Sequence, residues 1–248
     1  LEYRKATETS YTSVNVTPTF SYTINNLAAN TVYKYRLSAT INSVVSYSNE
    51  FTLRTPCQSV SLPYNEDLEA TYTEMPPCWY VSGGSVAIVS NGNNPVCQPH
   101  TGNYMLEYGS YWLTAGNYST VSFPMFSFPN DNYKVSFWIY RLHDYYSSAN
   151  EGVGVYINTT DTLLGATSLG FISNDRTSQP TMNADGWYNY SVNVPQGTNG
   201  NRFIILKLIS QYSNNTYLDD FSVRANSSIQ TIDDSFNISL YPNPSKET

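Results

Sequence analysis

The chain has 248 residues, enough for one large β domain or two smaller ones. Only 12% of the residues are charged, and polarity comes instead from Ser, Thr, Asn and 23 Tyr, a mixture that favours strands and polar loops over helices. The formal net charge of −7 repels phosphate backbones and anionic lipids, which argues against nucleic acid and membrane surfaces as partners.

Alternating apolar and polar segments recur along the chain, whereas few segments show a sustained 3.6-residue period. This pattern predicts an all-β protein. No apolar run approaches the roughly 20 residues of a membrane-spanning helix, so we expect no direct membrane insertion. The chain lacks an initiating Met and begins within a strand candidate, so we expect a fragment or a processed product.

Residues 1–56 contain two alternating runs joined by the short turn "LAAN". The second of these runs is "NTVYKYRLSA". The stretch resembles the second half of a fibronectin type III module. The resemblance places Tyr33 in the tyrosine-corner position, "LEYRKA" in the third strand and "SNEFTLRT" in the last. Counterparts of the first two strands are missing. We therefore expect this partial module to depend on preceding residues, or on docking against the segment C-terminal to it.

The cysteines are Cys57, Cys78 and Cys97, an odd number, so at most one intrachain disulfide forms and spacing alone leaves three pairings open. We favour Cys57 with Cys78, a pairing whose loop closure would contribute about 3 kcal/mol. The alternative is three buried thiols in a reducing compartment. Zinc fits poorly, because the spacings are long and the chain has only His100 and His143.

Residues 57–225 are expected to form the main domain. Strand candidates there include "YKVSFWIYRL", "GVGVYINT", "WYNYSVNV" and "NRFIILKLIS", separated by turns rich in Asn, Gly and Ser. About ten such strands in ~170 residues predict a two-sheet jelly-roll sandwich.

Several separated motifs in this segment fall in one order. They are "YNEDLEATYTEMPPCW", "PHTGNYMLEY", "VSFPMFSF" with "YKVSFWIYRL", "GWYNYSVNV" with "RFIILKLIS", and finally "TYLDDFSV". In this order they resemble MAM domains and their bacterial relatives, and the same architecture occurs in the cleaved-adhesin domains of bacterial surface proteases. The resemblance covers nearly the whole segment.

Adjacent carboxylates within the last strand candidate need an explanation, because Asp is disfavoured in strands and like charges repel. In a jelly roll the first and last strands lie close together, so "NEDLE" and "YLDDF" can converge at one edge. Ca²⁺ takes six to eight oxygen ligands, and a backbone carbonyl near residues 100–102 could add to the carboxylates. The candidate ligands are Glu66, Asp67, Glu69, Asp219 and Asp220.

The family resemblance implies that Glu69 and Asp219 hold a structural Ca²⁺. Strand alternation prevents every neighbouring carboxylate from pointing into one site. The alternative is that these carboxylates are solvated charges beside a turn, or partners of a buried Arg.

Catalysis is not expected in this chain. A hydrolytic triad needs a His between an acid and a nucleophile, and neighbours in an extended chain such as His143 and Asp144 point to opposite sides. The motifs GxSxG and HExxH and the phosphate loop are missing. A glycosidase needs only two carboxylates at the right separation, which the sequence does not formally exclude.

Aromatic residues also gather in or near the polar loops "YGSYWLTAGNY" and "YRLHDYYSS". They are Tyr111, Trp112, Tyr140, Tyr145 and Tyr146. Exposed rings can stack on sugar rings or anchor a protein partner, and core packing is the alternative.

Residues 226–236 are expected to be a polar linker, and residues 237–248 to open a new strand. "LYPNPS" resembles the start of the C-terminal sorting domain of type IX secretion, which implies export by the secretion machinery and surface attachment. The alternative is an ordinary Pro-rich turn.

These features predict a non-catalytic adhesion or substrate-binding region of a secreted, cell-surface bacterial protein. Its expected ligand is an extracellular glycan or protein, and its expected cofactor is structural Ca²⁺. One alternative is a carbohydrate-binding accessory module of an upstream glycoside hydrolase or peptidase. The other is a passive surface spacer.

Overall fold

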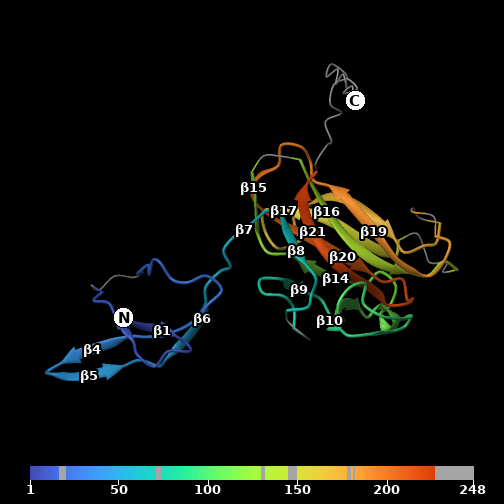
Figure 1. Cartoon of the computed structure of the whole chain (residues 1–248). Helices are drawn as coiled ribbons and strands as arrows, with labels where there is room; N and C mark the ends of the chain where they lie inside the picture. Colours follow the sequence, from blue (N-terminus) through green and yellow to red (C-terminus); the bar gives the residue numbers. More distant parts are fainter. Residues whose placement is uncertain are drawn as a thin grey trace, which may run out of the picture.

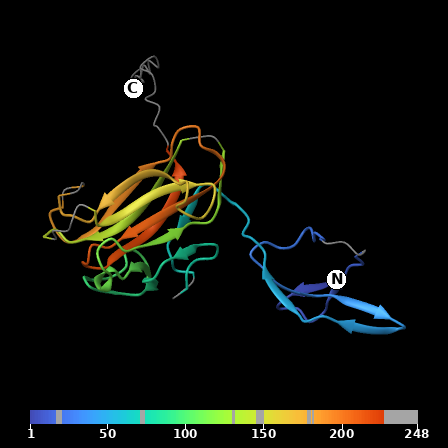
Figure 2. The same ribbon diagram turned by 180° about the vertical axis from the view of Figure 1, so that it is seen from behind.

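The computed structural model describes residues 1–16, 21–70, 74–129, 132–144, 150–177, 180 and 182–226. The predicted sorting-domain start and all but the first residue of the predicted linker lie outside this part. Figures 1 and 2 show residues 1–54, the N-terminal body, joined to a larger body by the stretch between β6 and β7. Among the described residues, no helix has the length and apolar character needed to span a bilayer.

The N-terminal body contains one antiparallel sheet of order β2-β1-β3-β6 and a separate hairpin, β4-β5. The strands are β1 (Glu2–Lys5), β2 (Thr12–Ser13), β3 (Val32–Arg36), β4 (Ser38–Ile41), β5 (Val44–Tyr47) and β6 (Phe51–Arg54). Tyr33 is buried, and its hydroxyl accepts a hydrogen bond of 3.0 Å from the backbone N–H of Ala28. A Tyr bonded to backbone a few residues upstream is the geometry of a tyrosine corner.

The larger body, residues 57–225, is a jelly roll of two packed sheets, as predicted. The first sheet has the order β10-β13-β21-β16-β19, and β8 also pairs with β21. Its strands are β8 (Tyr64–Glu66), β10 (Val86–Val89), β13 (Met105–Tyr108), β16 (Tyr133–Arg141), β19 (Gly186–Asn193) and β21 (Thr216–Ala225).

The second sheet has the order β18-β17-β20-β14-β9, with β15 pairing to β20 and to β7. Its strands are β7 (Val60–Ser61), β9 (Tyr80–Ser82), β14 (Tyr118–Ser122), β15 (Phe126–Pro129), β17 (Gly152–Asn158), β18 (Thr167–Ser173) and β20 (Asn199–Ile209). A short hairpin, β11 (Gly92–Asn93) with β12 (Val96–Cys97), and a 3₁₀ turn, η1 (Ser110–Trp112), complete the body.

The core lies between the two sheets. β16 buries every second residue, and Phe137 and Ile139 are fully buried in the same cluster as Leu206 and Leu208 of β20. Each such side chain contributes about 1.5–3 kcal/mol relative to exposure. The four strand candidates named from the sequence are all strands in the structure: they correspond to β16, β17, β19 and β20.

The strand that opens "YNEDLE" and the last strand of the jelly roll are neighbours, as the sequence predicted. β8 pairs antiparallel with β21, with Glu66 opposite Phe221. A disulfide joins Cys57 to Cys78, with 6.0 Å between their Cα atoms, which confirms the preferred pairing. Cys97 is a buried free thiol, and burial raises its pKa to about 12.

Candidate functional site

Loop 98–104, between β12 and β13, is held by carboxylates that come from the beginning and from the end of the jelly-roll sequence. Asp219 of β21 is fully buried, and its Oδ2 accepts hydrogen bonds from the backbone N–H groups of His100 (2.8 Å) and Thr101 (3.3 Å). Its Oδ1 accepts a third, from the N–H of Asp220 at 2.8 Å. Burial raises the pKa of Asp219 to about 7, although these backbone bonds lower it.

Asp220 reaches the same loop because β21 carries a bulge. Ser136 of β16 pairs with Ser222, but Trp138 pairs with Asp219, so β21 has one extra residue between these pairs. Asp220 adopts φ +47°, in the left-handed region that Asp tolerates better than most residues. Its carboxylate accepts from the Thr101 hydroxyl at 2.7 Å and lies 2.5 Å from His100 Nδ1. The bulge therefore turns two adjacent carboxylates toward one loop.

Glu69 binds the other end of loop 98–104. Its Oε1 accepts from the backbone N–H groups of Asn103 and Tyr104, both at 2.8 Å, and its Oε2 from the Asn103 side-chain amide at 3.0 Å. Burial opposes the charged form of Glu69, but these hydrogen bonds lower its pKa below the ordinary value. Gly102 has φ +60°, and a Cβ there would lie 2.3 Å from Glu69 Cδ, so the close approach requires glycine.

Glu66 and Asp67 bind their own turn instead. Glu66 accepts from the N–H of Leu68 at 3.0 Å, and Asp67 from the N–H of Glu69 at 3.2 Å. Leu68, within this turn, has φ +65° and is fully buried. The two hydrogen bonds therefore fix the turn that presents Glu69. They also line, with Asp220, a hollow of about 460 Å³ over the outer face of β16 and β21.

In the described part of the chain, no three His, Cys, Asp or Glu side chains are grouped as metal ligands. A carboxylate has about four acceptor positions. Asp219 and Glu69 each use three of them on the protein, which leaves one oxygen position on each for a cation. A buried carboxylate with a raised pKa would gain from a neighbouring cation. These two residues therefore fit Ca²⁺ only if backbone carbonyls or waters supply most of its oxygens.

The two histidines each contact aspartate side chains. Asp220 binds both His100 and Thr101, so the acid lies between the base and the hydroxyl, which is not the order of a hydrolytic triad. His143 lies with Nδ1 2.7 Å from Asp185 and Nε2 3.0 Å from Asp144. The expectation that His143 and Asp144 point apart is wrong, because residues 143–144 form a turn and not an extended strand.

The candidate aromatic residues do not form one platform. Tyr140 lies in β16 and packs with Trp187 against the small cluster around Cys97. Tyr111 and Trp112 lie in η1, where their side chains are 44% and 83% exposed, and their rings meet edge to face at 4.7 Å. Tyr145 and Tyr146 fall outside the described residues. Only Tyr111 and Trp112 are therefore brought together as exposed rings.

Sequence reasoning missed Glu107 and Asn215, which line a hollow beside Trp112. The Asn215 side-chain amide lies 3.4 Å from Glu107 Oε2, although the two residues are 108 positions apart. The only signal that could have paired them is the antiparallel register of β13 with β21, in which Glu107 faces Tyr217.

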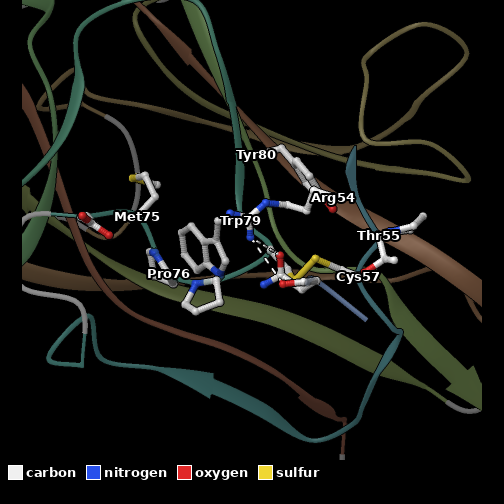
Figure 3. A pocket seen from close by; sticks show the side chains of 12 residues that line it. Arg54, Thr55, Cys57, Met75, Pro76, Trp79 and Tyr80 are labelled. Carbon is white, nitrogen blue, oxygen red and sulfur yellow. Dashed lines mark hydrogen bonds between the residues drawn. A yellow bond between two sulfur atoms is a disulfide. The ribbon is translucent and has the colours of Figure 1, made fainter. Parts of the chain in front are cut away.

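Another hollow, of about 550 Å³, lies at the junction of the two bodies. It is lined by the ends of β6 and the segment before β9, including the Cys57–Cys78 disulfide. Figure 3 shows Trp79 and Pro76 beside the cystine, with Arg54 and Thr55 from the N-terminal side. Trp79 is buried and donates from Nε1 to the Tyr64 hydroxyl at 2.9 Å, so its ring belongs to the jelly-roll core.

No protein-family model matches the sequence, and no curated protein matches it. Among solved structures, the chain is similar to the K1 cleaved adhesin domain of Lys-gingipain from Porphyromonas gingivalis W83. The identity is 20% and the TM-score 0.50, and the match covers 67% of this chain and 99% of that domain. This likeness shows a shared jelly-roll fold.

Two further solved structures match less well. The K3 cleaved adhesin domain of the same protein has 19% identity and a TM-score of 0.47, over 65% of this chain and 96% of that one. A complex of TmCBM61 with β-1,4-galactotriose has 20% identity and a TM-score of 0.37, over 59% and 88%.

Proposed function

We propose that this chain is a non-catalytic, adhesin-type binding region of a secreted, cell-surface bacterial protein. The proposal rests on which groups the carboxylate side chains bind. Glu69, Asp219 and Asp220 bind the backbone and side chains of loop 98–104, and none of them is paired with a base and a nucleophile in catalytic order. A rigid scaffold that fixes its surface loops suits binding. The fold shared with a cleaved adhesin domain supports the same role.

Structural Ca²⁺ is part of this proposal, with Glu69 and Asp219 as its side-chain ligands and backbone oxygens of residues 100–102 as further ligands. The support is the burial of Asp219 and the acceptor position left on each carboxylate. Extracellular modules bind Ca²⁺ with Kd of about 10⁻⁴ to 10⁻³ M. At 100 times Kd, the ion would add about 2.7 kcal/mol to the free energy of unfolding.

Thermal melts test the calcium component. The full chain should melt at a higher temperature in 10 mM Ca²⁺ than in chelator, and Asp219→Ala should abolish the difference. Asp67→Asn is the matched control, because Asp67 binds only its own turn, and it should keep the calcium response. Equal melting temperatures of the unmodified chain in calcium and chelator would remove Ca²⁺ from the proposal.

The terminal segments extend the proposal. Residues 1–56 would be a partial fibronectin type III spacer, supported by the tyrosine-corner bond of Tyr33. Residues 237–248 would begin the sorting domain through which the secretion machinery exports the protein.

Biolayer interferometry tests the binding component. The full chain would be exposed to immobilised collagen, fibronectin and fibrinogen, and to immobilised neutral polysaccharides. Saturable binding to any of these supports a binding region. Binding to none of them would favour a passive spacer. Glycan binding without protein binding would favour the alternative of a carbohydrate-binding accessory module. The exposed ring of Trp112 is the observation that supports this second function.

A further inference from the structure

An aromatic shelf, Tyr111 and Trp112, projects from η1 at one end of the jelly roll. Trp112 is 83% exposed, and its ring meets that of Tyr111 at an interplanar angle of 86°. Large aromatic side chains are well buried on average, and a ring as exposed as that of Trp112 is poorly accounted for by packing. The shelf therefore needs a reason outside the fold.

The shelf is held rigidly. Ser110 is fully buried and its hydroxyl donates to the carbonyl of Asn214 at 2.5 Å. The Ser210 hydroxyl lies 3.1 Å from the Ser110 carbonyl, and the N–H of Tyr111 donates to Asn215 Oδ1 at 3.1 Å. Because the backbone of η1 is fixed by residues 210, 214 and 215, which lie between β20 and β21, it needs little ordering when a ligand binds.

A hollow of about 580 Å³ lies against the shelf, and its other walls carry polar groups together with the small apolar side chains of Val86 and Ala87. Its lining includes Ser85, Asn93, Asn94, Glu107 and Asn215. The Asn215 side-chain nitrogen lies 3.4 Å from Glu107 Oε2, and Asn215 Oδ1 accepts one hydrogen bond from Tyr111, so the pair offers a ligand the carboxylate of Glu107 and the second lone pair of Asn215 Oδ1. The hollow thus pairs a flat apolar surface with several directional hydrogen-bonding groups.

This combination matches the chemistry of a neutral sugar ring. A pyranose presents a face of C–H groups that can stack on an aromatic ring, and hydroxyls at its edge that can bind carboxylates and amides. None of the residues that line the hollow is Lys or Arg, and Glu107 is acidic, which disfavours sulfated or carboxylated glycans and acidic peptides. A protein partner would need an interface of roughly 800 Å² on each side, far more than two rings provide.

We propose that this hollow is a binding site for neutral glycans, in which a pyranose stacks on Trp112 and hydrogen-bonds to Glu107 and Asn215. The inference rests on the proposed binding function and names its ligand class. It places the site at η1, β13 and the segment before β21, apart from the carboxylates that hold loop 98–104.

The test is affinity electrophoresis of the full chain in gels containing β-1,4-galactan, xylan, mixed-linkage β-glucan or mannan, followed by calorimetry with the retarding polysaccharide. Polygalacturonate is the anionic comparison. We expect at least one neutral polysaccharide to bind, and Trp112→Ala to weaken it by about tenfold or more. Trp112→Phe should retain part of the affinity, and Glu107→Gln should lose about three- to tenfold. Tyr118→Ala removes an exposed ring outside the hollow and should change nothing.

The variants must melt like the unmodified chain, which is expected because Trp112 is exposed. Retained glycan binding in Trp112→Ala would overturn this site while leaving the binding function standing. Binding of polygalacturonate alone, or of matrix proteins alone, would overturn the neutral-glycan assignment. Failure to bind any glycan or protein would overturn the site and the proposed function together.

Discussion

The N-terminal body and the jelly roll are built from the same kind of alternating strand, but they bury their apolar residues differently. In the jelly roll, Phe137 and Ile139 of β16 are fully buried between two sheets. In the N-terminal body, the β4-β5 hairpin leaves Ile41 and Val44 69% and 65% exposed. Alternation thus creates an apolar face, and only a second layer of structure buries it.

This difference implies that the free energy of unfolding is concentrated in residues 57–225. The jelly roll has a large contiguous buried cluster, whereas Tyr33 is the only buried apolar side chain of the described residues 1–54. Burial of apolar surface is the main favourable term in folding. Variants in each body can test whether the two differ in this way.

Removing a core ring should have the largest effect. Phe137→Ala deletes a buried ring whose centroid lies 6.1 Å from the ring centroid of Phe221. The change should lower the free energy of unfolding by about 3–5 kcal/mol. Phe51→Ala, in the N-terminal body, is the matched control, because that ring is 51% exposed.

Urea unfolding followed by Trp fluorescence measures this effect selectively, because all four Trp lie in residues 57–225. The Phe51→Ala transition should coincide with that of the unmodified chain. A shift as large as that of Phe137→Ala would show that the two bodies unfold as one unit, which would contradict the comparison.

Breaking the disulfide should have the next largest effect. The Cys57–Cys78 bond spans 21 residues, a segment that includes β7, β8 and the turn that presents Glu69. Replacing both cysteines with Ser should lower the free energy of unfolding by about 2–4 kcal/mol. The unmodified chain in reductant should give the same Trp-fluorescence transition as the double variant. No change in either sample would mean that strand pairing alone holds this segment.

The strands could be predicted from the sequence because alternation is a local signal. "YKVSFWIYRL" buries every second residue, and the predicted strand became β16. The pairing of an early strand with the last one followed from jelly-roll topology and is realised by β8 and β21. The disulfide was preferred but not determined, because spacing left three pairings open until the fold placed Cys78 beside Cys57.

The candidate site was predictable only in part. The sequence singled out Glu69 and Asp219, but most of their partners are backbone N–H groups of loop 98–104, which no residue pattern reveals. The bulge that turns Asp220 toward the loop depends on the register between β16 and β21. The exposed state of Trp112 was equally invisible, because a buried and an exposed Trp in a polar loop have the same local sequence.

Filling the space beside Glu69 should have a smaller effect. Gly102→Ala places a Cβ 2.3 Å from Glu69 Cδ at φ +60°, and should cost about 1–3 kcal/mol of unfolding free energy. Gly116→Ala is the matched control, because Gly116 has φ +85° and nothing lies within 4 Å of the added Cβ. Its cost should be the backbone strain alone.

A double-variant cycle isolates the contact with Glu69. Chemical denaturation of Gly102→Ala should show a smaller loss in a Glu69→Ala background than in the unmodified chain, because the crowded side chain is gone. Equal costs for Gly102→Ala and Gly116→Ala, with no coupling to Glu69, would mean that the loop moves away freely and that Glu69 does not fix it.

The smallest effect concerns an exposed ion pair at the edge of the jelly roll. The hydrogen bond to Asp185 raises the pKa of His143, and the same bond lowers the pKa of Asp185. A raised His pKa contributes stability below the unfolded value of about 6.5, and this is lost as pH rises through the folded pKa. A lowered Asp pKa contributes stability above its unfolded value of about 3.9, and this is lost as pH falls through the folded pKa. The pair should therefore stabilise most in the window between these two transitions.

An NMR titration of the His143 ring protons measures this pair without depending on a change in stability. The pKa should lie above 6.5, and Asp185→Asn should lower it more than Asp144→Asn, because the hydrogen bond to Asp185 is the largest cause of the shift. Both groups are substantially exposed, so solvent screening keeps the effect on unfolding small. A His143 pKa unchanged by Asp185→Asn would show that the hydrogen bond between His143 and Asp185 is not held in solution.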